Sequence, residues 1–377
     1  MIESPGLLIT VVAFLLVLGP LVFLHELGHY AAGRWFGVKV DAFAVGFGKE
    51  IAGFTDRHGT RWKFGWLPLG GYVRFAGDMN PASQPDAEWL QLPAAERVRT
   101  FQAKPVWQRA IIVAAGPAVN LLLAVAILGG FAAAYGVDRT PATIGSILPG
   151  SPAERAGLYP GDTITALGGR SVDTYRDMLM FTALRADETV RIDFERNGAV
   201  RSVDATIGAV SEPDRFGNVN KRGRLGIGPS SPVFMPVAVW QAPVEGVRMT
   251  GEILRGTVDG IIRIITGRIS AKEMGGPLRI AKASGEQFSL GWPALVTFVA
   301  FVSINLGFIN LLPVPMLDGG HLMFYAIEAV KRGPVRPQTM EWAFRGGLAL
   351  LLALMIFVTV NDLGTFGVWR GLAGLIG

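Results

Sequence analysis

Three long stretches without a charged side chain set the strongest limit on how this chain can fold. They cover residues 6–24, 110–135 and 287–317. About 18 to 20 apolar residues are enough to cross the hydrocarbon core of a bilayer as a helix. A fourth run, residues 346–361, is shorter and lies between Arg345 and Asp362, so it needs neighbouring residues or a thinned bilayer to span. The sequence predicts a mainly α polytopic membrane protein with four transmembrane helices.

The composition agrees with this prediction. Of the 377 residues, 50% are hydrophobic and 17% are charged, which is too apolar for an ordinary soluble domain. The first apolar run lacks the basic leading residues and the small-residue cleavage site of a signal peptide, so we expect it to be retained. The absence of cysteine excludes disulfides and thiolate metal sites. Basic loops account for the net charge of +5, and no other feature suggests nucleic-acid binding.

Basic side chains stay on the cytoplasmic side of a membrane protein, so they indicate its orientation. The connection between the first and second expected helices is rich in them, and so is the connection between the third and fourth. The first holds Arg34, Lys39, Lys49, Arg57, Arg61, Lys63 and Arg74, and the second holds Lys331, Arg332, Arg336 and Arg345. We therefore expect both connections in the cytoplasm, and both chain ends and the segment 138–286 outside.

The first connection contains a glycine- and aromatic-rich loop, residues 38–75. Its runs 41–45 and 61–66 have the composition of strands, and residues 56–59 have that of a hairpin turn. The sequence predicts a membrane-associated β-rich loop, because non-helical backbone survives at membrane depth only when it packs on protein or lines a cavity. A plain cytoplasmic linker is the alternative.

Residues 139–229 have the composition of a soluble α/β domain with β-branched alternation and turn residues. The turn before Ser151, a helix from there to Gly157, and the closing run Leu225-Gly226-Ile227 resemble a PDZ domain in the permuted arrangement of bacterial proteases. The resemblance implies that the closing run is a carboxylate-binding loop for a peptide or an exposed C-terminus, taken as an added strand. Peptide binding and simple restriction of access remain alternatives.

The segment 236–286 is expected to be a helical linker. Within residues 244–268, charged side chains recur every three or four positions and apolar ones lie between them. This pattern is typical of a helix that lies in the outer membrane interface. A helix packed on the soluble domain fits the pattern equally well.

The run His25-Glu26-Leu27-Gly28-His29 directly follows the first apolar stretch. On a helix, residues four apart share a face, so both imidazoles can bind one metal ion while Glu26 reaches its bound water. Zn²⁺ lowers the pKa of that water, and the carboxylate removes its proton to form the attacking hydroxide. Chance and a metal site without catalysis are the alternatives, and both are disfavoured because such polar groups are costly in a membrane helix.

A catalytic zinc needs a third protein ligand. Asp318 follows the third apolar stretch, where Pro313 and Pro315 break the helix. From the residues alone, Asp318 is either that ligand or a solvated boundary residue.

Separated motifs carry a resemblance to a known family. They are residues 25–29, 116–120 and 310–319 and, in the β-rich loop, residues 68–73. Together they resemble the site-2 protease family of intramembrane zinc metalloproteases, specifically its bacterial regulator of sigma-E protease branch. The resemblance covers nearly the whole chain and implies that Asp318 completes the zinc site. It also implies a bacterial inner membrane location, so the orientation given by the basic loops puts the PDZ domain and both termini in the periplasm. We expect the active site towards the cytoplasmic side, because His25 follows the apolar stretch that enters from outside.

The same resemblance implies further roles. Asn305 and Asn310 would hold the substrate backbone or stabilise the oxyanion, although helix-to-helix hydrogen bonding is the plainer role. Gly116 and Asn120 would support packing against the catalytic helix. The β-rich loop would clamp the substrate as an extended strand. His321 is a candidate to orient the site.

We therefore expect two membrane halves, residues 1–136 and 287–377, that form one zinc metalloendopeptidase. The expected substrate is a single-span membrane protein already shortened by another protease, such as an anti-sigma factor, and leftover signal peptides are a second candidate. The best-known members of the branch carry two tandem PDZ domains, whereas this sequence has one. A non-catalytic PDZ-bearing membrane receptor and a metal transporter are the rival functions, and the lipid bilayer is the expected environment.

Overall fold

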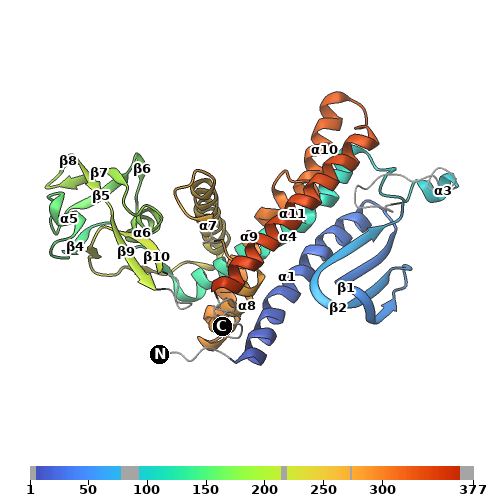
Figure 1. The fold of residues 1–377 in the computed structure, drawn as a ribbon, viewed down its shortest axis with the longest axis horizontal. Coiled ribbons are helices and arrows are strands. Elements are labelled where there is room, and N and C mark those ends of the chain that lie inside the picture. Colours follow the sequence, from blue (N-terminus) through green and yellow to red (C-terminus); the bar gives the residue numbers. More distant parts are fainter. Residues whose placement is uncertain (1–5, 78–92, 214–218, 272–273, 366–377) are drawn as a thin grey trace, which may run out of the picture. The chain divides into compact units, whose positions relative to one another are not determined.

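The computed structural model describes residues 6–77, 93–213, 219–271 and 274–365 (Figure 1). The chain forms two compact units, which are described separately. The membrane unit comprises Met1–Leu128, Gly246–Leu254 and Met274–Asp362, and the inserted unit comprises Gly129–Glu245, Arg255–Glu273 and Leu363–Gly377.

Four helices among the described residues are long and apolar enough to cross a membrane. They are α1 (Leu7–Trp35), α4 (Val106–Tyr135), α9 (Trp292–Leu311) and α11 (Pro337–Thr365). With the β-rich loop and the inserted α/β domain, they confirm the predicted fold class. The first and fourth helices are longer than their charge-free cores, so the charges at the predicted ends do not terminate them.

Asp362 explains how α11 continues past its apolar core. This carboxylate is fully buried, yet it accepts hydrogen bonds from the backbone N–H groups of Gly276 and Arg279 and pairs with the Arg279 guanidinium at 3.2 Å. These donors belong to the start of α8 (Pro277–Ser289), whose first N–H groups have no partner within the helix. A charge satisfied in this way can be buried within a helix.

The third apolar run does not form one helix. Its first residues end α8, and the chain turns at Gly291, whose φ of +101° is open to glycine at no steric cost, before α9 begins. After Leu311 the chain turns again through Pro313 and Pro315 and enters α10 (Asp318–Lys331). The third membrane helix, α9, is therefore shorter than the predicted span from residue 287. The connection between α9 and α11 contains a further helix, α10.

The β-rich loop forms two long antiparallel strands, β1 (Val40–Thr55) and β2 (Arg61–Phe75), which confirms its predicted strands and turn. Both strands bend, so that residues 40–45 pair with residues 71–75 and also with residues 61–64. Phe43, 1% exposed, stacks on Trp62 at 4.3 Å between ring centres. The loop is a small sheet with an aromatic core rather than a linker.

The inserted unit holds the predicted α/β domain (Figure 1). Its main sheet has the strand order β6-β5-β7-β8, and three two-stranded pairs, β4–β11, β9–β10 and β3–β12, surround it. The strands are β3 (Val137–Asp138), β4 (Ile144–Ile147), β5 (Thr163–Leu167), β6 (Arg170–Ser171), β7 (Thr189–Arg196), β8 (Ala199–Thr206), β9 (Gly208–Pro213), β10 (Val219–Arg224), β11 (Ile227–Pro229) and β12 (Phe234–Met235). One apolar core, which includes Ile164, Ile192 and Leu225, joins the sheet to its helices.

Two helices of this domain begin with side-chain caps. Ser151 accepts a hydrogen bond from the Glu154 N–H at the start of α5 (Pro152–Arg155), as the sequence predicts. Thr174 and Asp177 form a reciprocal capping box at the start of α6 (Tyr175–Ala183). Thus local signals fix where both helices enter the domain.

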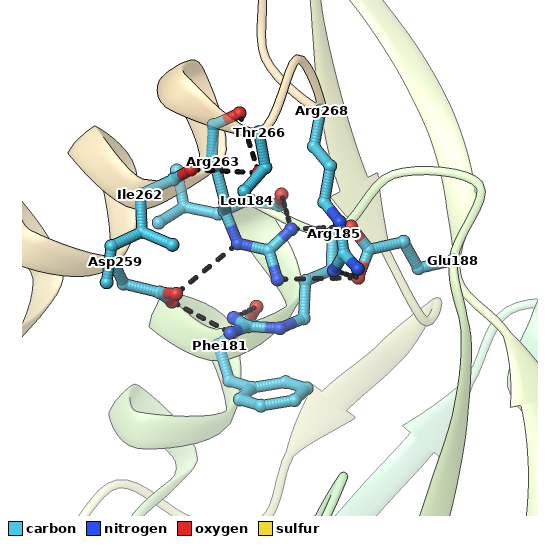
Figure 2. A network of polar contacts seen from close by, with 9 residues as sticks. All are labelled: Phe181, Leu184, Arg185, Glu188, Asp259, Ile262, Arg263, Thr266 and Arg268. Carbon is cyan, nitrogen blue, oxygen red and sulfur yellow. Dashed lines mark hydrogen bonds and ion pairs between the residues drawn. The ribbon is translucent and has the colours of Figure 1, made fainter.

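The amphipathic segment forms α7 (Ala242–Ile265), and its second half packs on the inserted domain (Figure 2). Arg263, 4% exposed, donates to the Leu184 carbonyl and pairs with Glu188 and Asp259. Arg185 donates to Asp259 at 2.8 Å and to the Phe181 carbonyl at 2.8 Å. These contacts support the packed-helix alternative for this half, whereas its placement in a membrane interface stays a prediction.

The first half of α7 belongs to the membrane unit. Met249, Ile253 and Leu254 pack on an apolar cluster from α4 and α9 that includes Ala124 and Ile304. Among its described residues, the predicted linker therefore contains two α-helices, α7 and α8, that make extensive tertiary contacts.

Candidate metal centre

Helix α1 carries His25, Glu26 and His29, all of which are buried. Its close approach to α4 depends on glycine, because a Cβ at Gly28 would lie 2.5 Å from the Ala115 carbonyl oxygen. At the point of closest approach, α4 in turn has Gly116, where a Cβ would lie 2.3 Å from His29 Nε2. The missing side chains let the histidine-bearing helix lie directly against its neighbour.

Asp318, the first residue of α10, reaches the two histidines from the other half of the membrane unit. The preceding Met316 adopts a φ of +84°, an unfavourable conformation for a non-glycine residue that marks a forced turn. A Cβ at Gly319 would lie 2.2 Å from the Leu312 carbonyl oxygen, and one at Gly320 would lie 2.4 Å from that of Val314. Both glycines therefore let α10 start tightly against the end of α9.

The three side chains converge on one point. His25 Nε2 lies 3.3 Å from His29 Nε2 and 3.2 Å from Asp318 Oδ2, and His29 Nε2 lies 3.6 Å from Asp318 Oδ1. Donor atoms bound to a tetrahedral zinc at about 2.0 to 2.2 Å lie about 3.3 to 3.6 Å from one another. The observed separations are close to these values, with a different carboxylate oxygen of Asp318 facing each histidine.

The donor set also fits zinc chemically. Two imidazole nitrogens and one carboxylate oxygen are the ligand types of catalytic zinc sites, which keep a fourth position open. Two unprotonated ring nitrogens facing each other would repel unless a cation lay between them. Among the described residues, His25, His29 and Asp318 form the group that could hold a metal ion.

A cavity of about 390 Å³ opens at this centre. Glu26 lines it beside the three ligands, and the β2 residues Gly71 and Tyr72 line it from the sheet. A Cβ at Gly71 would lie 2.9 Å from Glu26 Cγ, so the strand passes close to the Glu26 side chain. The cavity therefore brings together the three candidate metal ligands, the Glu26 carboxylate and a strand of the β-rich loop.

The remaining expected residues divide between this cavity and other places. Asn310 and His321 line the cavity. Asn305 does not appear among its described lining residues, and its side-chain amide donates to the Phe301 carbonyl of its own helix at 2.8 Å.

Gly116 and Asn120 both contact the histidines from α4. Asn120 is fully buried, and its side-chain nitrogen lies 3.2 Å from His25 Nδ1. The predicted peptide loop, by contrast, belongs to the inserted unit, where Leu225 is buried and Gly226 takes a φ of +79°.

Sequence reasoning missed one participant, the main-chain carbonyl of Ile112, which lies 2.9 Å from His29 Nδ1. A backbone carbonyl has no residue signature, so its position depends on the packing of α4. A weaker signal existed, because Ile112, Gly116 and Asn120 recur every fourth residue and so share one helix face.

Comparison with known proteins agrees with this geometry. The model of peptidase family M50 matches residues 13–354. A protein of Rhizobium meliloti named "Putative zinc metalloprotease" is 42% identical over 359 residues, which cover 94% of this chain and 96% of the relative. Metalloprotease MmpA of Caulobacter vibrioides is 35% identical over 395 residues, which cover 98% of this chain and 99% of the relative.

Two solved structures are similar to a quarter of this chain. The PDZ domain of an SdrC-like protein from Listeria monocytogenes covers 25% of this chain and 90% of its own, with 20% identity and a TM-score of 0.20. The corresponding domain from Listeria innocua covers 25% and 99%, with 18% identity and a TM-score of 0.20.

The M50 match begins before His25 and ends beyond Asp318, so it includes both parts of the chain that build the metal centre. Two relatives that this chain covers over 96% and 99% of their length are named as metalloproteases. The chain therefore belongs to peptidase family M50, the site-2 protease family of zinc metalloproteases.

Proposed function

We propose that this protease cleaves single-span membrane proteins within or beside their membrane segment, with His25, His29 and Asp318 as zinc ligands and Glu26 as general base. The observation that supports this most directly is the position of the centre between membrane-spanning helices, in a cavity that a β-strand borders. A peptide bond in that cavity would be both at membrane depth and next to a strand edge.

The chemistry follows from the chain's own groups. When held by His25, His29 and Asp318, zinc would supply the Lewis acidity that activates a water and the scissile carbonyl. Glu26 lines the same cavity and would remove a proton from the attacking water and then donate it to the leaving amine. Asn310 lines the same cavity and offers an amide N–H to the developing oxyanion. Asn305, whose amide bonds within its own helix, would need to turn before it could help.

The β-rich loop supports a route for unwinding the substrate. Residues 71–75 pair with β1 along one edge, and the other edge has no strand partner among the described residues. An extended peptide can add to such an edge through main-chain hydrogen bonds. Because a membrane helix must be unwound before hydrolysis, strand addition next to Glu26 would present an extended peptide bond to the centre.

The proposal also covers the substrate, the membrane in which the chain lies and its orientation there. The substrate would be a regulatory protein already shortened outside the membrane, of the anti-sigma factor type, or a leftover signal peptide. The chain would lie in a bacterial inner membrane with the inserted domain in the periplasm, where that domain binds a peptide or restricts access. The basic connections, which include Arg34 and Lys331, support this orientation.

The test is cleavage of a purified single-span reporter in liposomes by the native chain and by Glu26→Gln. Loss of the general base should lower kcat by at least about 100-fold while zinc stays bound at one ion per chain. Glu341→Gln, a change at an exposed glutamate paired with Arg345, serves as the matched control and should cleave normally.

Two outcomes would oppose the proposal. Unchanged cleavage by Glu26→Gln would reject this residue as the base. Zinc binding without cleavage of any reporter, together with tight peptide binding by the inserted domain, would favour the receptor function.

A further inference from the structure

One face of α4 supports both histidine ligands from behind. Ile112, Gly116 and Asn120 recur every fourth residue, so they lie one above another on the helix. Ile112 contributes a main-chain carbonyl, Gly116 contributes space, and Asn120 contributes an amide. Ile112 and Asn120 meet the Nδ1 atoms of His29 and His25, whereas Gly116 lies against Nε2 of His29.

The contact of His29 shows what such support does. Its Nδ1 lies 2.9 Å from the Ile112 carbonyl oxygen, which can only accept a hydrogen bond. Nδ1 must therefore carry the proton, and the lone pair of neutral imidazole is left on Nε2, the atom that faces His25 and Asp318. The contact fixes both the tautomer and the direction of the ring.

His25 needs the same arrangement, and Asn120 is the residue that faces its Nδ1. The side-chain nitrogen of Asn120 lies 3.2 Å from His25 Nδ1, while its Oδ1 is buried without a hydrogen-bond partner among the described residues. If the nitrogen faced Nδ1 with zinc present, two donors would oppose each other, because a ligand that binds through Nε2 carries its proton on Nδ1.

A half-turn of the Asn120 amide removes this conflict. The turn exchanges oxygen and nitrogen without moving the rest of the side chain. Oδ1 then accepts the hydrogen bond from His25 Nδ1, and the oxygen that lacked a partner gains one. The turn of α4 that holds this amide is itself fixed, because the buried Ser303 hydroxyl of α9 donates to the Asn120 carbonyl at 2.8 Å.

We propose that Asn120 is a positioning residue of the metal centre: its side-chain oxygen accepts a hydrogen bond from His25 Nδ1 and holds His25 in the tautomer whose Nε2 binds zinc. The two ligands are then supported in the same way, His29 by a main-chain carbonyl and His25 by a side-chain amide. A residue that orients a ligand in this way changes metal affinity without touching the metal or the substrate.

Two substitutions separate this role from simple packing. Asn120→Leu nearly keeps the shape of the side chain but removes the acceptor. Asn120→Asp keeps an acceptor oxygen and adds a charge. If Asn120 positions His25, the aspartate variant should resemble the native protein and the leucine variant should fail. If Asn120 only fills space, the leucine variant should be tolerated and the buried charge should be the harmful change.

The measurement is zinc affinity of the full-length chain in detergent, determined by competition with a chromophoric chelator. We expect Asn120→Leu to weaken zinc binding about 10- to 100-fold and Asn120→Asp to stay within a few-fold of native. Asn361→Leu is the matched control, since its amide donates to the Met274 carbonyl elsewhere in the membrane unit, and it should keep native affinity.

A second readout does not depend on affinity. The visible absorption bands of the Co²⁺-substituted protein report the geometry of the ligands, and they should shift for Asn120→Leu but not for Asn120→Asp. If the leucine variant does not fold, as judged by its melting curve, Asn120→Ala takes its place in the comparison. Native zinc affinity in the variant without an acceptor, or equal loss in the leucine and aspartate variants, would overturn the proposal.

Discussion

Gly116 makes room for a metal ligand, because any side chain there would occupy the position of His29. A Cβ would lie 2.3 Å from His29 Nε2, 2.6 Å from its Cε1 and 2.9 Å from its Cδ2. Gly116→Ala should therefore displace the ring and lower both zinc occupancy and cleavage by at least about 10-fold, on the scale of lost support for a ligand. Zinc content and reporter cleavage, measured on the same preparation, check this prediction.

Gly130→Ala provides the control on the same helix. A Cβ at Gly130 meets nothing within 4 Å, so the change adds helix propensity without a clash. Alanine is about 1 kcal/mol better than glycine in a helix interior, and the control should keep zinc, activity and stability. Equal loss in both variants would show that helix α4 responds to any substitution rather than to contact with His29.

Asp56 gives the hairpin turn of the β-rich loop a dependence on pH. Burial alone would raise the pKa of this carboxyl, but hydrogen bonds from the Trp62 indole and from the N–H groups of Thr60 and His58 outweigh it and lower the pKa from 3.8 to about 2. Because the folded pKa is the lower one, the ionised carboxylate stabilises the fold above pH 3.8.

That stabilisation should disappear as the pH falls from 3.8 to about 2. Asp56→Asn should consequently increase hydrogen exchange of the hairpin amides at pH 6, and the difference from native should shrink in the acidic window. Hydrogen exchange of residues 52–64 in detergent at several pH values measures this. A difference that stays constant across the range would mean that the charge of Asp56 does not stabilise the turn.

At the residue scale, the sequence predicted the side chains of the metal centre but not their support. The spacing of His25 and His29 requires only helix geometry, and the family resemblance added Asp318. The strained φ of Met316 and the carbonyl of Ile112 follow from the way α9, α10 and α4 meet, which no local pattern encodes. Asn120 was expected to support packing, whereas its contact with His25 suggests a more specific role.

At the element scale, α6 of the inserted domain already bonds to the strand of the predicted peptide loop. The Tyr175 hydroxyl donates to the Ile227 carbonyl at 2.8 Å. The neighbouring Gly226 carbonyl accepts from the Leu148 N–H beside β4, so the Ile227 carbonyl points to the opposite edge of β11. An added peptide strand needs this edge, and Tyr175 therefore competes with it.

Tyr175→Phe should remove that competitor and strengthen peptide binding about 2- to 10-fold, the scale of one neutral hydrogen bond. Fluorescence polarisation of a library of free C-terminal peptides against the full-length chain measures the change. Tyr159→Phe, at an exposed tyrosine of the same domain, should leave affinity unchanged. Weaker binding by Tyr175→Phe, or no binding by any form, would oppose a peptide groove at this edge.

The charged network between α7 and the inserted domain should behave as a structural clamp (Figure 2). Arg263 is 4% exposed and has two carboxylate partners, so Arg263→Met would leave Glu188 and Asp259 less well paired. Breaking a buried pair costs about 3 to 5 kcal/mol. We expect less here, about 2 kcal/mol, because Glu188 is partly exposed and Arg185 still pairs with Asp259.

Hydrogen–deuterium exchange of residues 255–268 measures the clamp locally, and Arg263→Met should increase it strongly. Arg268→Met is the matched control, since this arginine is exposed and lies 3.8 Å from Glu188. Surface pairs contribute at most about 1 kcal/mol, so the control should remain near native. Similar exchange in both variants would mean that apolar contacts, rather than the buried arginine, hold α7.

The elements that the sequence predicted well are those with a strong one-dimensional pattern. The charge-free cores of the membrane helices, the hairpin and the helix after Ser151 belong to this group. Helix α10 was missed because it lies in a connection interpreted through its basic residues, and the end of α8 was assigned to the apolar run that it shares with α9. The length of α11 depended on Asp362, whose partners come from α8.

At the scale of the whole molecule, the two membrane halves form one unit although the inserted domain separates them in the sequence. Unit boundaries show this directly, because residues before Leu128 and after Met274 belong together. The proposed metal centre requires this association of the two halves, since His25 and His29 come from the first half and Asp318 from the second. The sequence could predict this association only through the family resemblance, because no local pattern pairs distant segments.

Orientation in the membrane can be tested with unusual clarity because the chain has no cysteine. Val200, 75% exposed, lies in the inserted domain, and Val330, 85% exposed, lies near the end of α10 beside Lys331. If basic connections are cytoplasmic, Val200→Cys should react with a membrane-impermeant maleimide in intact spheroplasts, whereas Val330→Cys should react only after permeabilisation. The native chain supplies an unlabelled baseline. The reverse pattern would place the inserted domain in the cytoplasm, where it could not meet substrates shortened outside the membrane, and would therefore also reject the proposed order of cleavage.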